Sequence, residues 1–165
     1  MKKILFAILM MAPLSIFAQK FAHFDSSTII PNMKEYVAAQ SELETLQKQY
    51  TEDLKRMEDE LQKKGEEYQK EQAKLLDNVK QRREAELQDL YTRIQQTAQD
   101  NQQALSKASS DKMQAIQDLI MAAIKKVGEA GGYIYIVDTS AGVIPFVNPT
   151  LSTDVTPEIK KALGM

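Results

Sequence analysis

The sequence GGYIYIVD, residues Gly131 to Asp138, contains five consecutive apolar or aromatic residues from Tyr133 to Val137. β-Branched and aromatic residues are enriched in strands, so this stretch predicts a β-strand. Successive side chains in a strand point to opposite faces, which places Tyr133, Tyr135 and Val137 on one face and Ile134 and Ile136 on the other. Because both faces are apolar, we expect both to be covered.

The preceding residues, from about 34 to 127, have a different character: they contain no proline and are rich in charge and glutamine. Their apolar residues recur mostly at spacings of three, four or seven, which is typical of amphipathic helices with a narrow apolar stripe. The predicted stripe residues are Leu43, Leu46, Tyr50, Leu54, Met57, Leu61 and Tyr68, and then Leu87, Tyr91, Ile94, Ala98, Leu105, Ile116, Leu119, Ala123 and Val127.

A single helix of this length would be about 140 Å long at 1.5 Å per residue. A hairpin would instead return the chain, so that an early strand could meet the strand after Gly131. Asp77 and Asn78 interrupt the stripe, and Asn78 followed by Gln81 resembles the start of a second helix. We therefore predict a hairpin over residues 34–128, with its tip at about Leu75–Val79 and arms of about 65–75 Å.

The segments on either side of this hairpin predict a small sheet. KFAHFD, residues 20–25, is the expected first strand, and residues 19–33 include the connection to the hairpin. In residues 129–165 we expect the strand above, a turn at TSAG, a third strand at VIPFV (143–147) and a final helix over 157–163 with Thr156 as its N-cap. The predicted fold class is α+β.

One chain has too few elements to cover both faces of such a sheet. Its short helix and the bases of the two arms could cover one face, so a neighbouring subunit is the economical cover for the other. We therefore predict that the strands form an oligomerisation body. Its predicted residues are Phe21, Phe24, Tyr133, Ile134, Tyr135, Ile136, Val137, Ile144 and Phe146.

The first residues of the chain predict export. Lys2 and Lys3 precede an apolar run from Ile4 to Phe17, and Ala18 precedes a change to polar residues, as in a secretory signal peptide (residues 1–18) cleaved after Ala18. The run is shorter than the ~20 residues that span a bilayer, so we expect no stable membrane insertion. The chain has no cysteine, which excludes a lipoprotein anchor. The expected location is the periplasm.

Composition argues against several classes of function. The net charge is −2, and becomes more negative when Lys2 and Lys3 are removed, which argues against nucleic acid as a partner. A thiol nucleophile is impossible without cysteine, and the single histidine, His23, lies in a predicted strand and is expected to be structural. Because the sequence also contains no phosphate-binding loop and no HExxH or GxSxG motif, we expect neither an enzyme nor a bound metal or cofactor.

Four features in order resemble the Skp/OmpH family of periplasmic chaperones: a signal peptide, the strand KFAHFD, a long charged hairpin, and a strand with Gly132, Tyr133, Val137 and Asp138 followed by DVTPEI, residues 154–159. The resemblance implies a homotrimer whose helical arms enclose a cavity for unfolded outer-membrane β-barrel proteins, without ATP. The chain departs from some members in being acidic, and His23 stands where a tyrosine or another large residue is usual.

Two features of the hairpin suggest roles in binding. Near the predicted tip, Leu75, Leu76 and Val79 adjoin Lys80, Arg82 and Arg83, a basic cluster that could contact clients or could simply be solvated and paired with Glu84 and Glu86. Gly65 is either a hinge or a tolerated glycine. The alternative function is an envelope coiled-coil scaffold or adaptor, although the heptad pattern fails around Lys64–Gly65 and Asn101.

Overall fold

A computed structural model describes residues 19–165; the predicted signal peptide lies outside the described residues. The described chain is mostly helical, with two long helices and a small three-stranded sheet, and is an α+β protein. It divides into two compact units. The first, here called the strand body, joins the residues up to Ile30 to Ile120–Met165, and the second, the hairpin arm, is Pro31–Leu119.

The sheet contains β1 (Lys20–Phe24), β2 (Tyr133–Asp138) and β3 (Ser152–Asp154) in the order β2-β1-β3. Both neighbours run parallel to β1, and Ala22 pairs with Ile136 on one side and with Thr153 on the other. Both β1 and β2 lie where the sequence predicts strands. The first predicted strand is therefore the centre of the sheet, and β2 is an edge.

One face of the sheet packs against the chain's own helix. Ala22 and Phe24, which share this face with Ile136, are buried. A Cβ added at Gly128 would lie 3.4 Å from Ile136 Cδ1, so the last turns of α3 (Asp77–Gly131) contact this face. Ile29, Ile120, Ala123, Val155 and Ile159 complete the buried core of the strand body. The helix ends at Gly131, and Gly132 turns the chain into β2 with φ +65°.

The predicted third strand is wrong. Residues 143–147 form no strand and lie in the connection from Thr139 to Leu151, here called the β2–β3 loop. Pro145 lacks the N–H that a ladder requires, and the free edge of β1 is occupied by Ser152–Asp154 instead. The predicted turn at TSAG is present, with the Gly142 N–H donating to the Thr139 carbonyl at 3.5 Å.

The final helix α4 runs from Thr156 to Ala162, with Pro157 in its first turn, but Thr156 is not its N-cap. The cap residue is Val155, and the Thr156 N–H donates to Asp154 Oδ1 at 2.9 Å. The Thr156 hydroxyl accepts from the Asp25 N–H at 3.1 Å, which joins the helix to the end of β1. Hydrogen bonding to Thr156 holds the pKa of Asp154 below its usual value.

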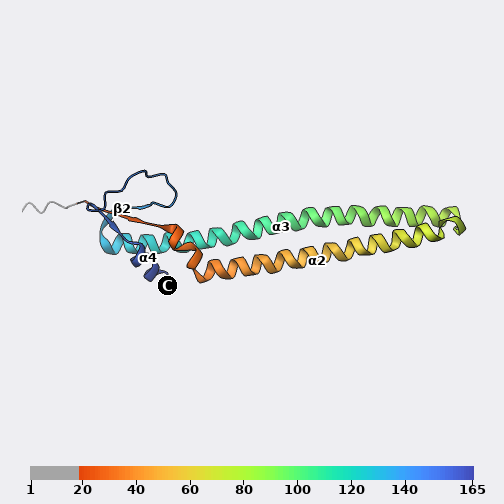
Figure 1. Ribbon diagram of the computed structural model, residues 1–165, viewed down its shortest axis with the longest axis horizontal. Helices are drawn as coiled ribbons and strands as arrows, with labels where there is room; N and C mark the ends of the chain where they lie inside the picture. Colours follow the sequence, from red (N-terminus) through yellow and green to blue (C-terminus); the bar gives the residue numbers. More distant parts are fainter. Residues whose placement is uncertain (1–18) are drawn as a thin grey trace, which may run out of the picture. The chain divides into compact units, whose positions relative to one another are not determined.

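The hairpin arm consists of α2 (Lys34–Glu71) and the part of α3 up to Leu119, which lie side by side in Figure 1. The short helix η3 (Gln72–Lys74), followed by Leu75 and Leu76, makes the tip, slightly earlier than predicted. Asn78 is not an N-cap, because α3 already begins at Asp77 and the Lys80 N–H donates to the Leu76 carbonyl at 3.0 Å.

The seam between the two helices follows the predicted stripe on α2, where all seven predicted residues from Leu43 to Tyr68 are half-buried. On α3 the prediction is partly wrong. Leu90, Ile94 and Ile116 are buried, whereas Tyr91, Ala98 and Leu119 are exposed. The α3 seam also contains half-buried polar residues, among them Arg83, Thr97, Asn101 and Lys112.

Polar contacts connect the two helices across this seam. The Arg83 guanidinium lies 3.4 Å from the Glu71 carboxylate, Lys112 pairs with Glu42, and the Tyr68 hydroxyl donates to Glu84. Between Ile94 and Ile116, however, no residue of α3 is fully buried, and Asn101 Nδ2 is buried without a hydrogen-bond partner in the described structure. An unsatisfied buried amide is unfavourable, so the middle of the α3 seam is its weakest part.

We expect Asn101→Leu to stabilise the arm locally, because it replaces an unsatisfied amide with an apolar side chain. Relief of about 1–2 kcal/mol should slow amide hydrogen exchange over residues 95–112 by roughly 5- to 30-fold. Gln102→Leu is the matched control, because Gln102 is exposed and its replacement should leave exchange unchanged. Equal slowing by both variants would show that the Asn101 amide is not the cause.

Candidate functional site

The second face of the sheet presents an aromatic pair. Phe21 and Tyr135 are neighbours in the β1–β2 register, and their rings stack with centroids 6.3 Å apart and planes 10° apart. Tyr135 is 65% exposed and Phe21 is 38% exposed. These side chains lie opposite the face that α3 covers, because they alternate with Ala22 and Ile136 along their strands. We call this surface the aromatic face.

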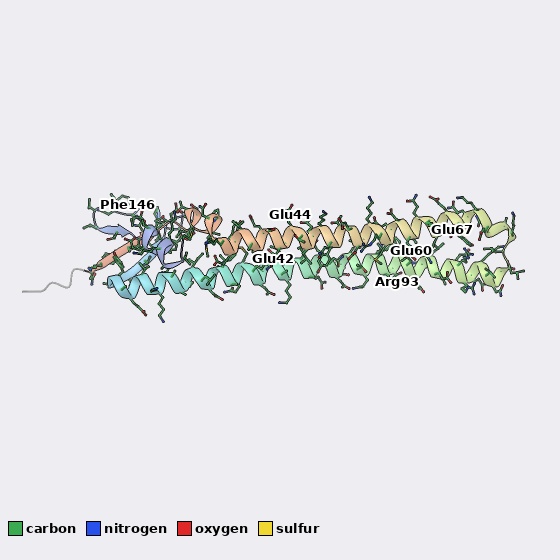
Figure 2. All side chains as sticks on the ribbon, turned by 90° about the horizontal axis from the view of Figure 1, so that it is seen from below. Glu42, Glu44, Glu60, Glu67, Arg93 and Phe146 are labelled. Carbon is green, nitrogen blue, oxygen red and sulfur yellow. The ribbon has the colours of Figure 1, made fainter. Side chains whose placement is uncertain are left out.

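The β2–β3 loop presents further uncovered apolar side chains. Val143 is 80% exposed, Phe146 73% and Leu151 72%. Figure 2 shows Phe146 at the outer side of the strand body, away from the last turns of α3. Exposed apolar side chains that gather in this way mark interaction surfaces, whereas singly scattered ones are ordinary.

The predicted oligomerisation residues therefore fall into two groups. Phe24 is buried and Tyr133, Ile136, Val137 and Ile144 are half-buried within one chain. The exposed members are Phe21, Ile134, Tyr135 and Phe146. Ile136 lies on the face that the chain's own α3 contacts. The uncovered face is the one that carries Tyr135.

Polar motif residues hold the strand body together. At the ends of β1 and β2, the Ser26 hydroxyl donates to Asp138 Oδ2 at 2.6 Å and the Ser140 N–H donates to Asp138 Oδ1 at 2.9 Å. Burial of Asp138 opposes ionisation, but these hydrogen bonds outweigh it and the pKa of Asp138 is lowered. His23 Nδ1 lies 2.9 Å from Ser152 Oγ, a contact between β1 and β3 that fits a structural role.

The tip of the hairpin arm combines an exposed leucine with paired charges. Leu76 is 72% exposed, while Leu75 and Val79 are half-buried. Lys80 lies 3.4 Å from Asp77, and Arg82 lies 3.8 Å from Glu86. Arg83 pairs with Glu71 across the arm, whereas Glu84, one of the two partners considered for this cluster, accepts from Tyr68.

The Arg82–Glu86 pair is exposed, whereas Lys80 and Arg83 are half-buried. Ion pairs in contact with solvent contribute little to stability. Arg82 is therefore the cation of this cluster that is most accessible to an anionic partner.

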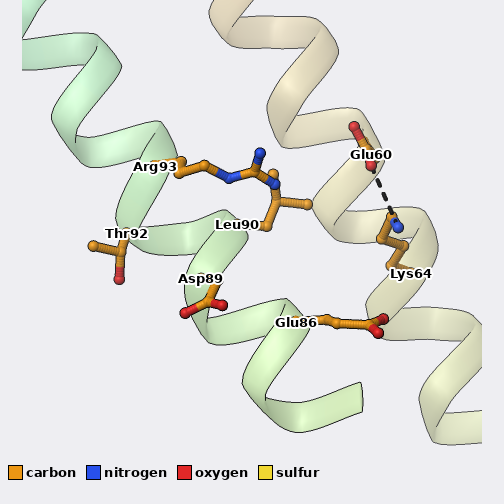
Figure 3. Close-up of a pocket in the computed structure, with 7 residues that line it drawn as sticks. All are labelled: Glu60, Lys64, Glu86, Asp89, Leu90, Thr92 and Arg93. Carbon is orange, nitrogen blue, oxygen red and sulfur yellow. Dashed lines mark ion pairs between the residues drawn. The ribbon is translucent and has the colours of Figure 1, made fainter. Parts of the chain in front are cut away.

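An open groove beside the arm contains mixed charges (Figure 3). Its lining residues are Glu60, Lys64, Glu86, Asp89, Leu90, Thr92 and Arg93, and Glu60 lies 3.4 Å from Lys64. Throughout the part of the chain that the structure describes, no three histidine, cysteine or carboxylate side chains are grouped to hold a metal ion. The groove fits a solvated flank of the seam.

No described helix is both long and apolar enough to cross a bilayer. The described chain presents a small parallel sheet with an uncovered aromatic face, and a long helical arm with a largely polar surface.

The chain belongs to the family of OmpH-like outer membrane proteins, whose model matches residues 20–163. Among solved structures, it resembles the crystal structure of a candidate outer membrane chaperone (OmpH-like) from Caulobacter crescentus CB15. That match has a TM-score of 0.75 at 17% identity and covers 88% of this chain and 83% of the other. At this identity the likeness establishes the fold alone. A search of curated proteins gives no match.

Gly65 lies inside α2, half-buried on the stripe between Leu61 and Tyr68. A Cβ added there would have no atom within 4 Å. The site therefore has room for alanine, and close packing does not explain the glycine. Glycine costs a helix about 1 kcal/mol relative to alanine, so Gly65 makes this part of α2 easier to bend. We propose that it is a hinge.

Gly65→Ala should therefore stabilise the arm by about 1 kcal/mol and reduce bending of α2. Spin labels on cysteines introduced at Lys55 and Gln72, on either side of Gly65, should show a narrower distance distribution in the variant. Gln69→Ala, an exposed change on the same helix, is the control. If the distribution keeps its width while stability rises, Gly65 is only a tolerated glycine.

Proposed function

We propose that this protein is an ATP-independent periplasmic holdase. It forms a homotrimer through the strand body, binds unfolded outer-membrane β-barrel proteins between the hairpin arms and prevents their aggregation. The observation that carries the proposal is the arm itself. The 38-residue helix α2 and the part of α3 up to Leu119 meet along a narrow seam and leave most of their surface to solvent.

Such an arm suits many weak and reversible contacts. Its exposed apolar side chains are few and separated, as at Val37, Leu76 and Tyr91. Each single contact is weak. When one arm holds a client, however, the effective concentration of that client at the other arms is raised. Release then needs no energy source, because each contact can open separately. An unfolded barrel protein offers many matching sites, because its strands alternate apolar and polar residues.

Family membership supports the chaperone class, and the uncovered aromatic face supports assembly through the strand body. Periplasmic location is proposed from the predicted signal peptide and the family. A fixed envelope scaffold is less well supported, because half-buried polar residues such as Asn101 interrupt the seam.

The holdase proposal is tested by diluting several unrelated barrel proteins from urea in the presence of the purified protein. Light scattering should show that stoichiometric trimer keeps all of them soluble without ATP. Size-exclusion chromatography with multi-angle light scattering should give the mass of three chains. A scaffold would suppress aggregation of none of them or of a single partner, and either result would reject the proposal.

The tip cluster makes a separate prediction about encounter rate. We expect client association to be slower at low salt when Lys80, Arg82 and Arg83 are together replaced by glutamine. At high salt, where charges are screened beyond ~8–10 Å, the variant should associate as fast as the wild type. Lys48, Lys107 and Lys125 form the matched control, because each is exposed and paired along its helix. Stopped-flow fluorescence measures both variants. Equal slowing of the two would assign the effect to net charge and not to the tip.

A further inference from the structure

The β2–β3 loop has an unusual composition for an exposed segment. Residues 139–151, TSAGVIPFVNPTL, contain no charged side chain, although charged residues make up 27% of the sequence. Val143, Phe146 and Leu151 within it are 72–80% exposed. Surface loops are normally polar, and depletion of charge is the compositional mark of the core of a protein interface. The loop has the composition of a covered segment.

The loop is held in shape at its two ends. The Gly142 N–H donates to the Thr139 carbonyl at one end, and the Ser152 N–H donates to the Asn148 carbonyl at 3.0 Å at the other. Asn148 Oδ1 also accepts from the Thr150 N–H at 2.9 Å. These bonds fix the two ends of the loop, and Val143 and Phe146 lie between them. In Figure 1 the loop lies on the side of the strands opposite the last turns of α3.

The aromatic face lies on this same side of the sheet, yet the loop does not cover it within one chain, because Tyr135 remains 65% exposed. Each chain therefore carries two different apolar surfaces, an extended loop and an aromatic platform. β2 has one charged residue, Asp138, and it is already engaged by Ser26 and Ser140. Contact between the two surfaces would desolvate no unpaired charge.

We propose that the β2–β3 loop of one copy docks on the aromatic face of the next copy. A contact between two different patches is heterologous, so each copy can bind the next in the same way. The copies form a closed ring when the rotation between neighbouring subunits allows it. A second copy is the fitting occupant because every chain supplies both surfaces in equal number. This inference rests on the proposed homotrimer and specifies how its subunits meet, with Phe146 and Tyr135 at the centre of each contact.

Cysteine cross-linking tests the direction of the contact, because the chain has no native cysteine. Tyr135→Cys and Phe146→Cys are purified separately, then mixed in urea, refolded and treated with a short bifunctional maleimide. The mixture should give cross-linked dimers, whereas each variant alone should give few. The double variant should give covalent dimers and trimers. Leu76→Cys mixed with Tyr135→Cys is the control that should not react between chains.

Phe146→Asp supplies the energetic test. Phe146 is 73% exposed, so the variant should fold, but a charge placed in the contact should raise the concentration at which the oligomer dissociates by about tenfold or more. Leu76→Asp, with 72% exposure at the arm tip, should leave that concentration unchanged.

Several outcomes would overturn the inference. If light scattering gives a trimer but Tyr135→Cys and Phe146→Cys do not cross-link with each other, the subunits meet elsewhere and the loop contact is wrong, while the proposed trimer stands. A trimer of unchanged stability in Phe146→Asp, with client binding lost, would make the loop a client contact instead. A wild-type monomer would overturn both the loop contact and the proposed assembly.

Discussion

Parallel pairing of β1 with β2 is the constraint on which the rest of the fold depends. Two parallel neighbours cannot be joined by a tight turn, so the chain must leave one end of β1 and return to the other. In most folds a single helix makes this crossover. Here the whole hairpin is inserted in it, which is why strands more than a hundred residues apart in sequence, Lys20–Phe24 and Tyr133–Asp138, are neighbours.

This constraint also accounts for the unequal lengths of the two long helices. α3 has 55 residues against 38 in α2, and its last turns, from Ile120 onward, belong to the strand body. About 12 helical residues rise about 18 Å, and a strand of six residues spans about 20 Å. The end of α3 is therefore long enough to bring the chain back along β2, and its contact with Ile136 covers one face of the sheet. The other face has no such helix.

Prediction from sequence succeeded where the pattern of one segment determines its structure. β2 is apolar throughout, and the α2 stripe repeats regularly, so both were predicted correctly. β3 was missed because Ser152–Asp154 is short and polar and is a strand only because β1 offers it an edge. Val143–Val147 has strand-like residues but no edge to join. On α3, Arg83, Asn101 and Lys112 occupy seam positions that a hydrophobic pattern cannot reveal. The exposure of the aromatic face could not be predicted from the sequence, because it depends on which face of the sheet α3 covers.

Apart from the signal peptide and the charged hairpin, the residues that carry the family resemblance serve the strand body. Gly132 allows the turn into β2, Asp138 joins the ends of β1 and β2, Asp154 begins α4, and Val155 and Ile159 are fully buried. None of them lies in the hairpin arm, whose requirements are only a seam at helical spacing and a solvated exterior. The charge of that exterior can therefore change without disturbing the fold. If the arm surfaces meet the client as proposed, an acidic member can retain the body while the charge of its arms determines how strongly salt affects client capture.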